Sequence, residues 1–279
     1  MTGSLAAGAK APGRVLLIGC GPGDPDLITV RAMRRIAEAD VLVVDRLVGA
    51  GVLAHARADA VVIPVGKEAG GPSTPQDEIN RVLVREALKG QVVARLKGGD
   101  AFVFGRAAEE IAAVRAADID VEIVPGITAA HACAASIALP LTLRESVRHF
   151  SLVTGATADG EVNLDWPALS TPGQAFAIYM GVRTARTLRS KLLAAGASPS
   201  LPIVVVENGT RSNELAVATT LSDLVDAISA FGIRGPAIIF GGLDWEDANL
   251  TIPDKVHVYR APADRTAGSA REASAPDAF

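Results

Sequence analysis

One glycine-containing segment, RLKGGDAFVFGRAAEE at 95–110, is the most informative part of the chain. Gly98 and Gly99 carry no side chains, so a ligand can approach the backbone closely there. Asp100 follows them and can accept hydrogen bonds from a ribose diol. Because the segment follows an expected strand, it should lie at the edge of the sheet where α/β proteins bind their ligands.

An arginine and a glutamate follow this loop at helical spacing. Arg106 comes where a helix is expected to begin, and Glu109 lies three residues later on the same face. A salt bridge that only anchors the helix is the plain alternative for such a pair. The preceding Gly-Gly-Asp loop favours a role at a ligand instead.

A second glycine-containing loop, GCGPGDP at 19–25, partly resembles a nucleotide-binding motif. It begins like the dinucleotide fingerprint G-x-G-x-x-G, but Asp24 occupies the third glycine position. Pro22 and Pro25 also lack the backbone N–H groups that a phosphate needs. A nucleotide-dependent oxidoreductase is therefore disfavoured, and NAD(P)H binding is the observation that would restore it. A simple surface turn is the other alternative for this loop.

Two further charged residues follow expected strands. Asp45 follows the run at 41–44, and Lys67 follows the run at 60–65. A charge at the carboxyl end of a buried strand is poised at the ligand edge of the sheet. Taken alone, either residue fits a solvated loop equally well.

These residues must be positioned by the strands and helices between them. Apolar runs alternate with helical patterns along the chain, and this alternation predicts an α/β fold with mainly parallel strands and flanking helices. The expected strands are 15–18, 41–44, 60–65, 92–96, 121–124, 150–154, 175–180, 203–206 and 237–240, and the clearest helices are 29–39, 184–195 and 222–231. The expected organisation is a disordered N-terminus at 1–13, lobes at 14–125 and 126–260, and a disordered tail at 261–279. The Pro-Gly stretch at 123–128 is the expected junction between the lobes.

Composition indicates a soluble globular protein of 279 residues. Lys and Arg total 27 and Asp and Glu total 31, so the formal net charge is −4, and only 4% of residues are aromatic. This argues against nucleic-acid binding, which needs a basic field and stacking platforms. Two cysteines, Cys20 and Cys133, exclude a disulfide scaffold and are expected to be buried. The four histidines are scattered, so no metal site is predicted.

No secretory signal or membrane span is expected. The N-terminus lacks a basic region followed by an apolar run. The uncharged stretch at 123–143 is long enough to span a membrane, but prolines, glycine, hydroxyl residues and a histidine interrupt it. We expect a buried turn and helix there, and a cytoplasmic protein.

The motifs together resemble the uroporphyrinogen-III C-methyltransferases, which belong to the tetrapyrrole methylases that use S-adenosylmethionine (SAM). In order, the matching motifs are GCGPGDPDLITVRA (19–32), DRLV (45–48), GK (66–67), RLKGGDAFVFGRAAEE (95–110), VPGITAA (124–130), LPLTLR (139–144), VTGA (153–156), YMG (179–181) and ENGT (207–210). Each motif alone is modest support, whereas the ordered set over about residues 14–245 is very specific.

The resemblance implies a two-lobed fold with the active site in the cleft between the lobes, and a homodimer. It implies two successive methyl transfers from SAM to C2 and C7 of uroporphyrinogen III, with S-adenosylhomocysteine as by-product. The product, precorrin-2, feeds the biosynthesis of sirohaem, cobalamin or haem d1. SAM carries no phosphate, which suits the proline-containing loop at 19–25. The polycarboxylate substrate calls for Arg and Lys clamps.

Site residues also follow from the resemblance, position by position. SAM contacts are implied at Pro22, Gly98, Gly99, Asp100, Val103, Thr128, Ala129, Met180 and Gly209. Substrate contacts are implied at Arg106, Arg144 and Met180, and catalytic roles at Asp45, Lys67, Arg106 and Glu109, with Asp45 and Lys67 as proton acceptor and donor. No metal is implied. Met180 has a plain alternative as an ordinary core methionine.

The chain departs from the family pattern at a few positions. Ala101 stands where proline is usual, and Ala107-Ala108 where glycine is common. Leu143 replaces the histidine that usually precedes the arginine matching Arg144, which removes a titratable group near the expected substrate. Two further alternatives follow. One is a methylase of a later precorrin intermediate with the same fold, and the other is a non-catalytic SAM or tetrapyrrole regulator. The chain retains the charged residues with implied catalytic roles, which argues against a non-catalytic regulator. These residues are Asp45, Lys67, Arg106 and Glu109.

Overall fold

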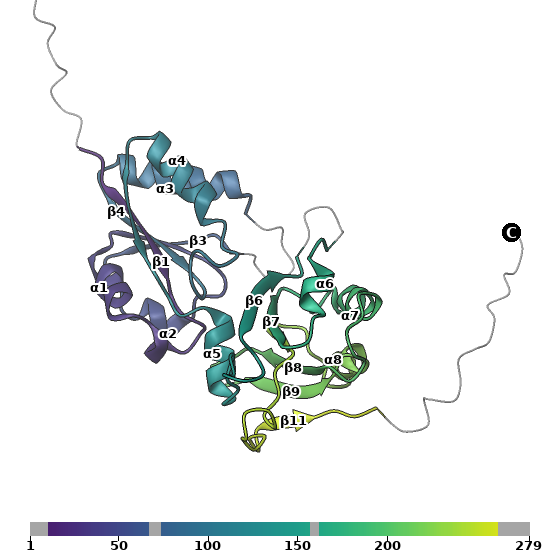
Figure 1. Ribbon diagram of the computed structural model, residues 1–279. Coiled ribbons are helices and arrows are strands. Elements are labelled where there is room, and N and C mark those ends of the chain that lie inside the picture. Colours follow the sequence, from purple (N-terminus) through teal and green to yellow (C-terminus); the bar gives the residue numbers. More distant parts are fainter. Residues whose placement is uncertain (1–10, 67–73, 157–161, 262–279) are drawn as a thin grey trace, which may run out of the picture.

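The computed structural model describes residues 11–66, 74–156 and 162–261, and its strands form two sheets that lie side by side (Figure 1). The first sheet has the strand order β3-β2-β4-β1-β5, and the second β11-β9-β8-β10-β7-β6. The first sheet comprises β1 (Arg14–Gly19), β2 (Val41–Val44), β3 (Val61–Pro64), β4 (Val92–Lys97) and β5 (Asp120–Val124). The second comprises β6 (His149–Thr154), β7 (Gln174–Tyr179), β8 (Pro202–Glu207), β9 (Leu215–Thr220), β10 (Ala237–Gly241) and β11 (Val256–Val258). The expected fold class is confirmed.

All strand pairs of the first sheet are parallel, and helices cover both of its faces. On one face lie α1 (Val30–Glu38) and α2 (Ala50–Leu53), and on the other α3 (Gln76–Leu88) and α4 (Ala107–Ala116). The short 3-10 helix η1 (Pro25–Leu27) precedes α1. Strand β2 shows why the sequence folds this way. Its four residues are all buried, with Leu42 packing on the α1 face and Val43 on the α3 face.

The second sheet is mixed, so the expectation of mainly parallel strands holds less well there. The pairs β6–β7 and β9–β11 are parallel, whereas β7–β10, β10–β8 and β8–β9 are antiparallel. Across both sheets parallel pairs still outnumber antiparallel ones. Strand β9 was not among the expected strands. Only seven residues, 208–214, separate it from β8, too few for a parallel crossover, so the two strands pair antiparallel.

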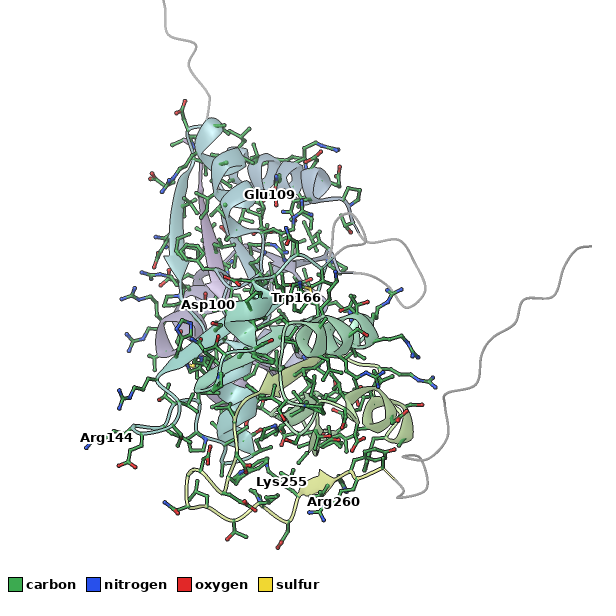
Figure 2. All side chains as sticks on the ribbon, turned by 45° about the vertical axis from the view of Figure 1, so that its right-hand side comes forward. Asp100, Glu109, Arg144, Trp166, Lys255 and Arg260 are labelled. Carbon is green, nitrogen blue, oxygen red and sulfur yellow. The ribbon has the colours of Figure 1, made fainter. Side chains whose placement is uncertain are left out.

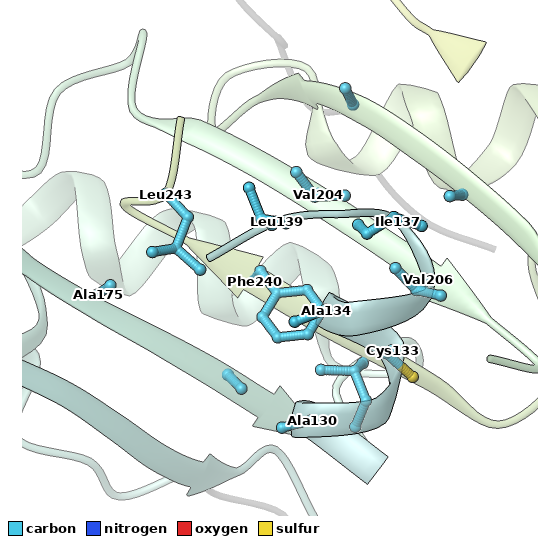
Figure 3. Packing of buried hydrophobic residues seen from close by; sticks show 14 of the residues in the cluster. Ala130, Cys133, Ala134, Ile137, Leu139, Ala175, Val204, Val206, Phe240 and Leu243 are labelled. Carbon is cyan, nitrogen blue, oxygen red and sulfur yellow. The ribbon is translucent and has the colours of Figure 1, made fainter. Parts of the chain in front are cut away.

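Helix α5 (Ala129–Ser136) covers one face of the second sheet, and α6 (Trp166–Leu169), α7 (Ala185–Ala194) and α8 (Leu224–Ala230) cover the other. Alanines and Cys133 let α5 pack closely on Val206 and Phe240 (Figure 3). The uncharged stretch at 123–143 therefore forms a turn and a buried helix, as expected. In the part of the chain that the structure describes, no helix is long and apolar enough to cross a membrane.

A hydroxyl cap and a glycine mark the ends of two helices of the first half. Thr29 Oγ1 accepts a hydrogen bond from Ala32 N–H (3.2 Å) and caps α1. Gly90, at φ +78°, ends the turn after α3. Pro75 occupies the N-cap position of α3, and the helix begins at Gln76.

Candidate active site

Five loops, each following a strand, meet between the two sheets. The loops after β1 and β4 are tied directly by backbone hydrogen bonds. Gly99 N–H donates to Gly21 O (2.6 Å), and Gly21 N–H donates to Gly99 O (3.1 Å). The pairing holds Pro22 beside the Gly98-Gly99 loop. This is the strand-end edge at which the sequence predicts a ligand.

Asp100 joins this pair of loops to the loop after β5. Its Oδ2 accepts from Gly126 N–H (2.9 Å), and its Oδ1 accepts from Phe102 N–H (2.8 Å). Val103 N–H in turn donates to Asp100 O (3.2 Å). A carboxylate has about four lone-pair sites, so a ribose hydroxyl can still bond to Asp100. Figure 2 shows this residue near the middle of the molecule.

Tyr179, at the end of β7, brings the second sheet to the same place. Its hydroxyl lies 2.6 Å from Thr128 Oγ1 and accepts from Ala130 N–H (3.0 Å). Its ring packs against Phe104, with centroids 5.0 Å apart. Burial raises the pKa of the Tyr179 phenol, so the group stays protonated at neutral pH. Tyr179 lies in the matching YMG motif at 179–181, but the resemblance implies no role for it.

The loop after β8 completes the arrangement. Gly209 lies directly against Cys133 of α5, so a side chain there would collide with the thiol. Thr210 Oγ1 accepts from Asp24 N–H (3.2 Å), and Arg211 Nη2 donates to Leu47 O (2.8 Å). Both cysteines are buried, as predicted, and burial raises the pKa of Cys133 to about 12.

Backbone strain is concentrated in these loops. Among the described residues, eight other than glycine have positive φ, and five of them lie here, namely Phe104, Arg106, Met180, Asn208 and Thr210. Such conformations are costly for bulky or β-branched residues. They persist where the surroundings enforce them, and they cluster at functional sites. The strain therefore marks the same place as the motifs do.

Gly99 lets the loop after β4 run close to the first turn of α5. A Cβ on Gly99 would lie 3.5 Å from Ala129 N, which is ordinary van der Waals contact. Gly99 also has φ +68°, which favours glycine. The bare backbone at Gly99 and the lone pairs of Asp100 are groups to which the nucleoside part of SAM can bond.

Arg106 and Glu109 form the predicted pair. Arg106 Nε donates to Glu109 Oε1 (2.7 Å) and Nη2 to Oε2 (2.6 Å), so the guanidinium and the carboxylate meet with two parallel bonds. The bonds raise the pKa of Arg106 and lower that of Glu109. The side chains are about half exposed, at 58% and 48%. An accessible pair can exchange its internal bonds for bonds to a substrate.

A buried charge cluster under this pair was missed. Glu110 accepts from Arg95 Nε (2.9 Å), from Lys97 Nζ (3.0 Å) and from Gln76 Nε2 (3.2 Å). Burial lowers the pKa of Lys97, and neighbouring Arg95 lowers it further, while Glu110 opposes both. Arg95 and Lys97 alternate with Leu96 on β4, so their period of two could have indicated one charged face.

Not all of the remaining predicted site residues lie near the converging loops. Asp45 follows β2 and accepts from Arg46 N–H (2.9 Å), and Met180 follows Tyr179 with its side chain exposed. Arg144 lies at the periphery of the second half, away from Asp100 and Glu109 (Figure 2). Lys67 lies outside the described residues. The functional roles of all these residues stay predictions.

Leu143 is half-buried rather than facing a polar site. It packs against the core under α5 and pairs with Val147 through backbone hydrogen bonds of 2.8 and 3.0 Å. An apolar side chain therefore suits its surroundings in this chain.

The family model for tetrapyrrole (corrin/porphyrin) methylases matches residues 14–225, and the chain belongs to this family. A solved uroporphyrin-III C-methyltransferase from Thermus thermophilus, in complex with S-adenosyl homocysteine, is similar with a TM-score of 0.71 and 36% identity, covering 85% of this chain and 99% of that one. A cobalt precorrin-4 methyltransferase is similar with a TM-score of 0.73 and 30% identity, covering 82% and 94%.

Curated relatives are named siroheme synthase. That of Gluconacetobacter diazotrophicus is 44% identical over 239 residues, covering 85% of this chain and 51% of the relative. That of Methylococcus capsulatus is 46% identical over 231 residues, covering 82% and 49%. The chain thus spans about half the length of these curated relatives.

Proposed function

We propose that the protein is a SAM-dependent C-methyltransferase that converts uroporphyrinogen III to precorrin-2 by methylation at C2 and C7. The observation that carries the proposal is the convergence of the loops after β1, β4, β5, β7 and β8 on one strained site, in a chain similar to a methyltransferase solved with S-adenosyl homocysteine. The product would feed the biosynthesis of sirohaem, cobalamin or haem d1.

SAM supplies a methyl group that its sulfonium makes electrophilic. The chain's part is then to hold SAM, align a substrate carbon for in-line attack and exclude water. Gly98, Gly99 and Asp100 would hold the nucleoside with Pro22, Val103, Thr128, Ala129, Met180 and Gly209 around it. The bare backbone at Gly98 and Gly99, with φ +68° at Gly99, supports a SAM site lined by main-chain atoms.

On the substrate side, Arg106 would bind a carboxylate of the tetrapyrrole, with Arg144 and Met180 as further contacts. The planar guanidinium already binds the Glu109 carboxylate in the two-bond geometry that a substrate carboxylate needs. Glu109 and Asp45 are candidates to accept the proton that the methylated ring releases, and Lys67 is a candidate donor.

A second candidate is methylation of a later precorrin. The similarity to a cobalt precorrin-4 methyltransferase, together with Leu143 in place of the usual histidine, favours testing it. Parallel anaerobic incubations with SAM, one with uroporphyrinogen III and one with precorrin-2, separate the two. The proposal expects uroporphyrinogen III to be methylated at the higher kcat/KM, and preference for a later precorrin would support the alternative.

The organisation of the protein is proposed on the same basis. We expect lobes at 14–125 and 126–260 with the active site in the cleft between them, a homodimer and a cytoplasmic location. Light scattering of the purified protein tests the dimer directly.

A further inference from the structure

Two adjacent residues of the second half hold the loops of the first half. Among the side-chain hydrogen bonds of the described residues, two join a residue before position 125 to one after position 145. Thr210 Oγ1 accepts from Asp24 N–H (3.2 Å), and Arg211 Nη2 donates to Leu47 O (2.8 Å). The loop after β8 therefore supplies two hydrogen bonds between the halves, in addition to the packing of Phe104 against Tyr179.

Arg211 also contacts the neighbouring loop after β1. A Cβ on Gly23 would lie 2.6 Å from Arg211 Nε and 2.8 Å from its Cγ, so the arginine stem lies directly over this glycine. One side chain thus contacts both the loop that carries Pro22 and the loop that carries Asp45.

Leu47 connects Arg211 to the loop after β4. A Cβ on Gly98 would lie 2.8 Å from Leu47 Cβ, so Leu47 packs against the bare face of Gly98. Its backbone carbonyl is the group that Arg211 holds. Any movement of Leu47 would therefore change the surface behind the predicted SAM loop.

A hollow lies beside these contacts. It has a volume of about 410 Å³ and is lined by Arg211 and by loops of both halves that include Gly23, Gly49, Gly51, Thr210 and Ser212. At this point the halves are joined by the hydrogen bond of Arg211 to Leu47 O and by the packing of its side chain on Gly23. Its neighbour Thr210 holds an unfavourable φ of +66°, and Glu214 accepts from Thr210 N–H (2.6 Å), which fixes the turn.

We propose that Arg211 is a positioning residue for SAM binding, which holds the loops at 22–25 and 45–49 in the arrangement that closes around Gly98. It acts through Leu47 and Gly23 and need not touch SAM itself. The inference rests on the proposed function for its ligand, but not for the contact between the halves.

Arg211→Met tests this, because methionine keeps an apolar stem over Gly23 and removes the donor to Leu47 O. Arg211→Lys keeps a donor. The matched control is Arg189→Met, which removes an arginine-to-carbonyl hydrogen bond to Ser222 O (3.2 Å) within the second half. Isothermal calorimetry with S-adenosylhomocysteine and steady-state kinetics with SAM are the functional readouts. Hydrogen exchange of peptides covering 22–25 and 45–49 is the structural readout, and it needs no ligand.

We expect Arg211→Met to weaken S-adenosylhomocysteine and to raise the KM for SAM about tenfold, with kcat nearly unchanged. Exchange at 22–25 and 45–49 should accelerate, Arg211→Lys should recover most of the affinity, and Arg189→Met should change none of these. Unchanged affinity in Arg211→Met, or equal effects in Arg189→Met, would overturn the proposal. If the wild type bound neither ligand, the proposed function would fail, and unaltered exchange in Arg211→Met would then overturn the contact's role separately.

Discussion

Glu109 and Glu110 are consecutive residues of α4, and one binds a cation at the surface while the other binds cations in the interior. Glu109 meets Arg106 at the surface (2.6 Å), while Glu110 is buried and bonds Lys97 Nζ (3.0 Å) at the end of β4. Lys97 Cε in turn would lie 3.0 Å from a Cβ on Gly105, the residue before Arg106. The buried pair therefore supports the turn that presents the exposed pair.

This arrangement predicts different consequences for the two glutamates. Glu110→Gln leaves Arg95 and Lys97 buried without a compensating charge, and should cost about 3–5 kcal/mol of stability. Glu109→Gln should cost much less stability than Glu110→Gln, because exposed pairs contribute little. Urea unfolding of both variants measures the difference. Equal losses would contradict the division of roles.

Glu109 and Arg106 are instead expected to matter for rate. Arg106→Lys and Glu109→Gln should lower methylation about a hundredfold, the scale of a misplaced substrate or a lost proton transfer. The melting temperature should fall only slightly, and S-adenosylhomocysteine binding should be retained. Arg81→Lys and Glu78→Gln are matched controls, since these residues form an exposed pair with the same spacing on α3. A lower melting temperature with unchanged specific activity in both test variants would show a merely structural pair.

The Arg106–Glu109 pair also predicts a pH dependence. Its hydrogen bonds lower the pKa of Glu109 in the folded state. A depressed carboxyl pKa gives stability that is fully present above the unfolded value, about 4.3, and is lost as pH falls through the folded value. The difference in melting temperature between wild type and Glu109→Gln should therefore stay constant from about pH 8 to pH 5 and shrink below about pH 4. A difference that varies near neutrality would not fit this pair.

Asp100 is expected to support SAM binding in two ways. Asp100→Ala removes an acceptor for the ribose and releases Gly126 N–H. Its S-adenosylhomocysteine affinity should fall by about 1.5–3 kcal/mol in calorimetry. Asp244→Ala, which removes a comparable carboxylate-to-backbone bond to Glu246 N–H far along the chain, is the control. The ribose assignment should be abandoned if Asp100→Ala binds as tightly as wild type.

Leu143 stands where the family usually has a histidine, and in this chain it packs against the core. If the usual histidine assists the reaction, Leu143→His should raise the rate per folded molecule. It should also lower stability by about 1–2 kcal/mol, because Leu143 packs against the core. Leu141→His provides the control, as Leu141 packs against the same core two residues earlier. A rate no higher than that of the control would mean that this position does not influence the chemistry.

Much of the fold and part of the site could be predicted from local patterns. Buried runs such as 41–44 read clearly as parallel strands, and the Gly98-Gly99-Asp100 loop does lie at their carboxyl edge. The contacts that carry no local signal were missed. Arg211 bonds Leu47 across 164 positions, and nothing near either residue indicates the other. Strand β9 was missed although the valine and threonines of LAVATT favour strands.

The number of methyl groups transferred to uroporphyrinogen III tests the central claim most directly. Purified protein is incubated anaerobically with the acceptor and SAM carrying an isotopically labelled methyl group, and the tetrapyrrole product is analysed by mass spectrometry and NMR. We expect two labelled methyl groups per tetrapyrrole, at C2 and C7, and one S-adenosylhomocysteine formed for each methyl group transferred. A product without label, or label confined to other positions, would contradict it.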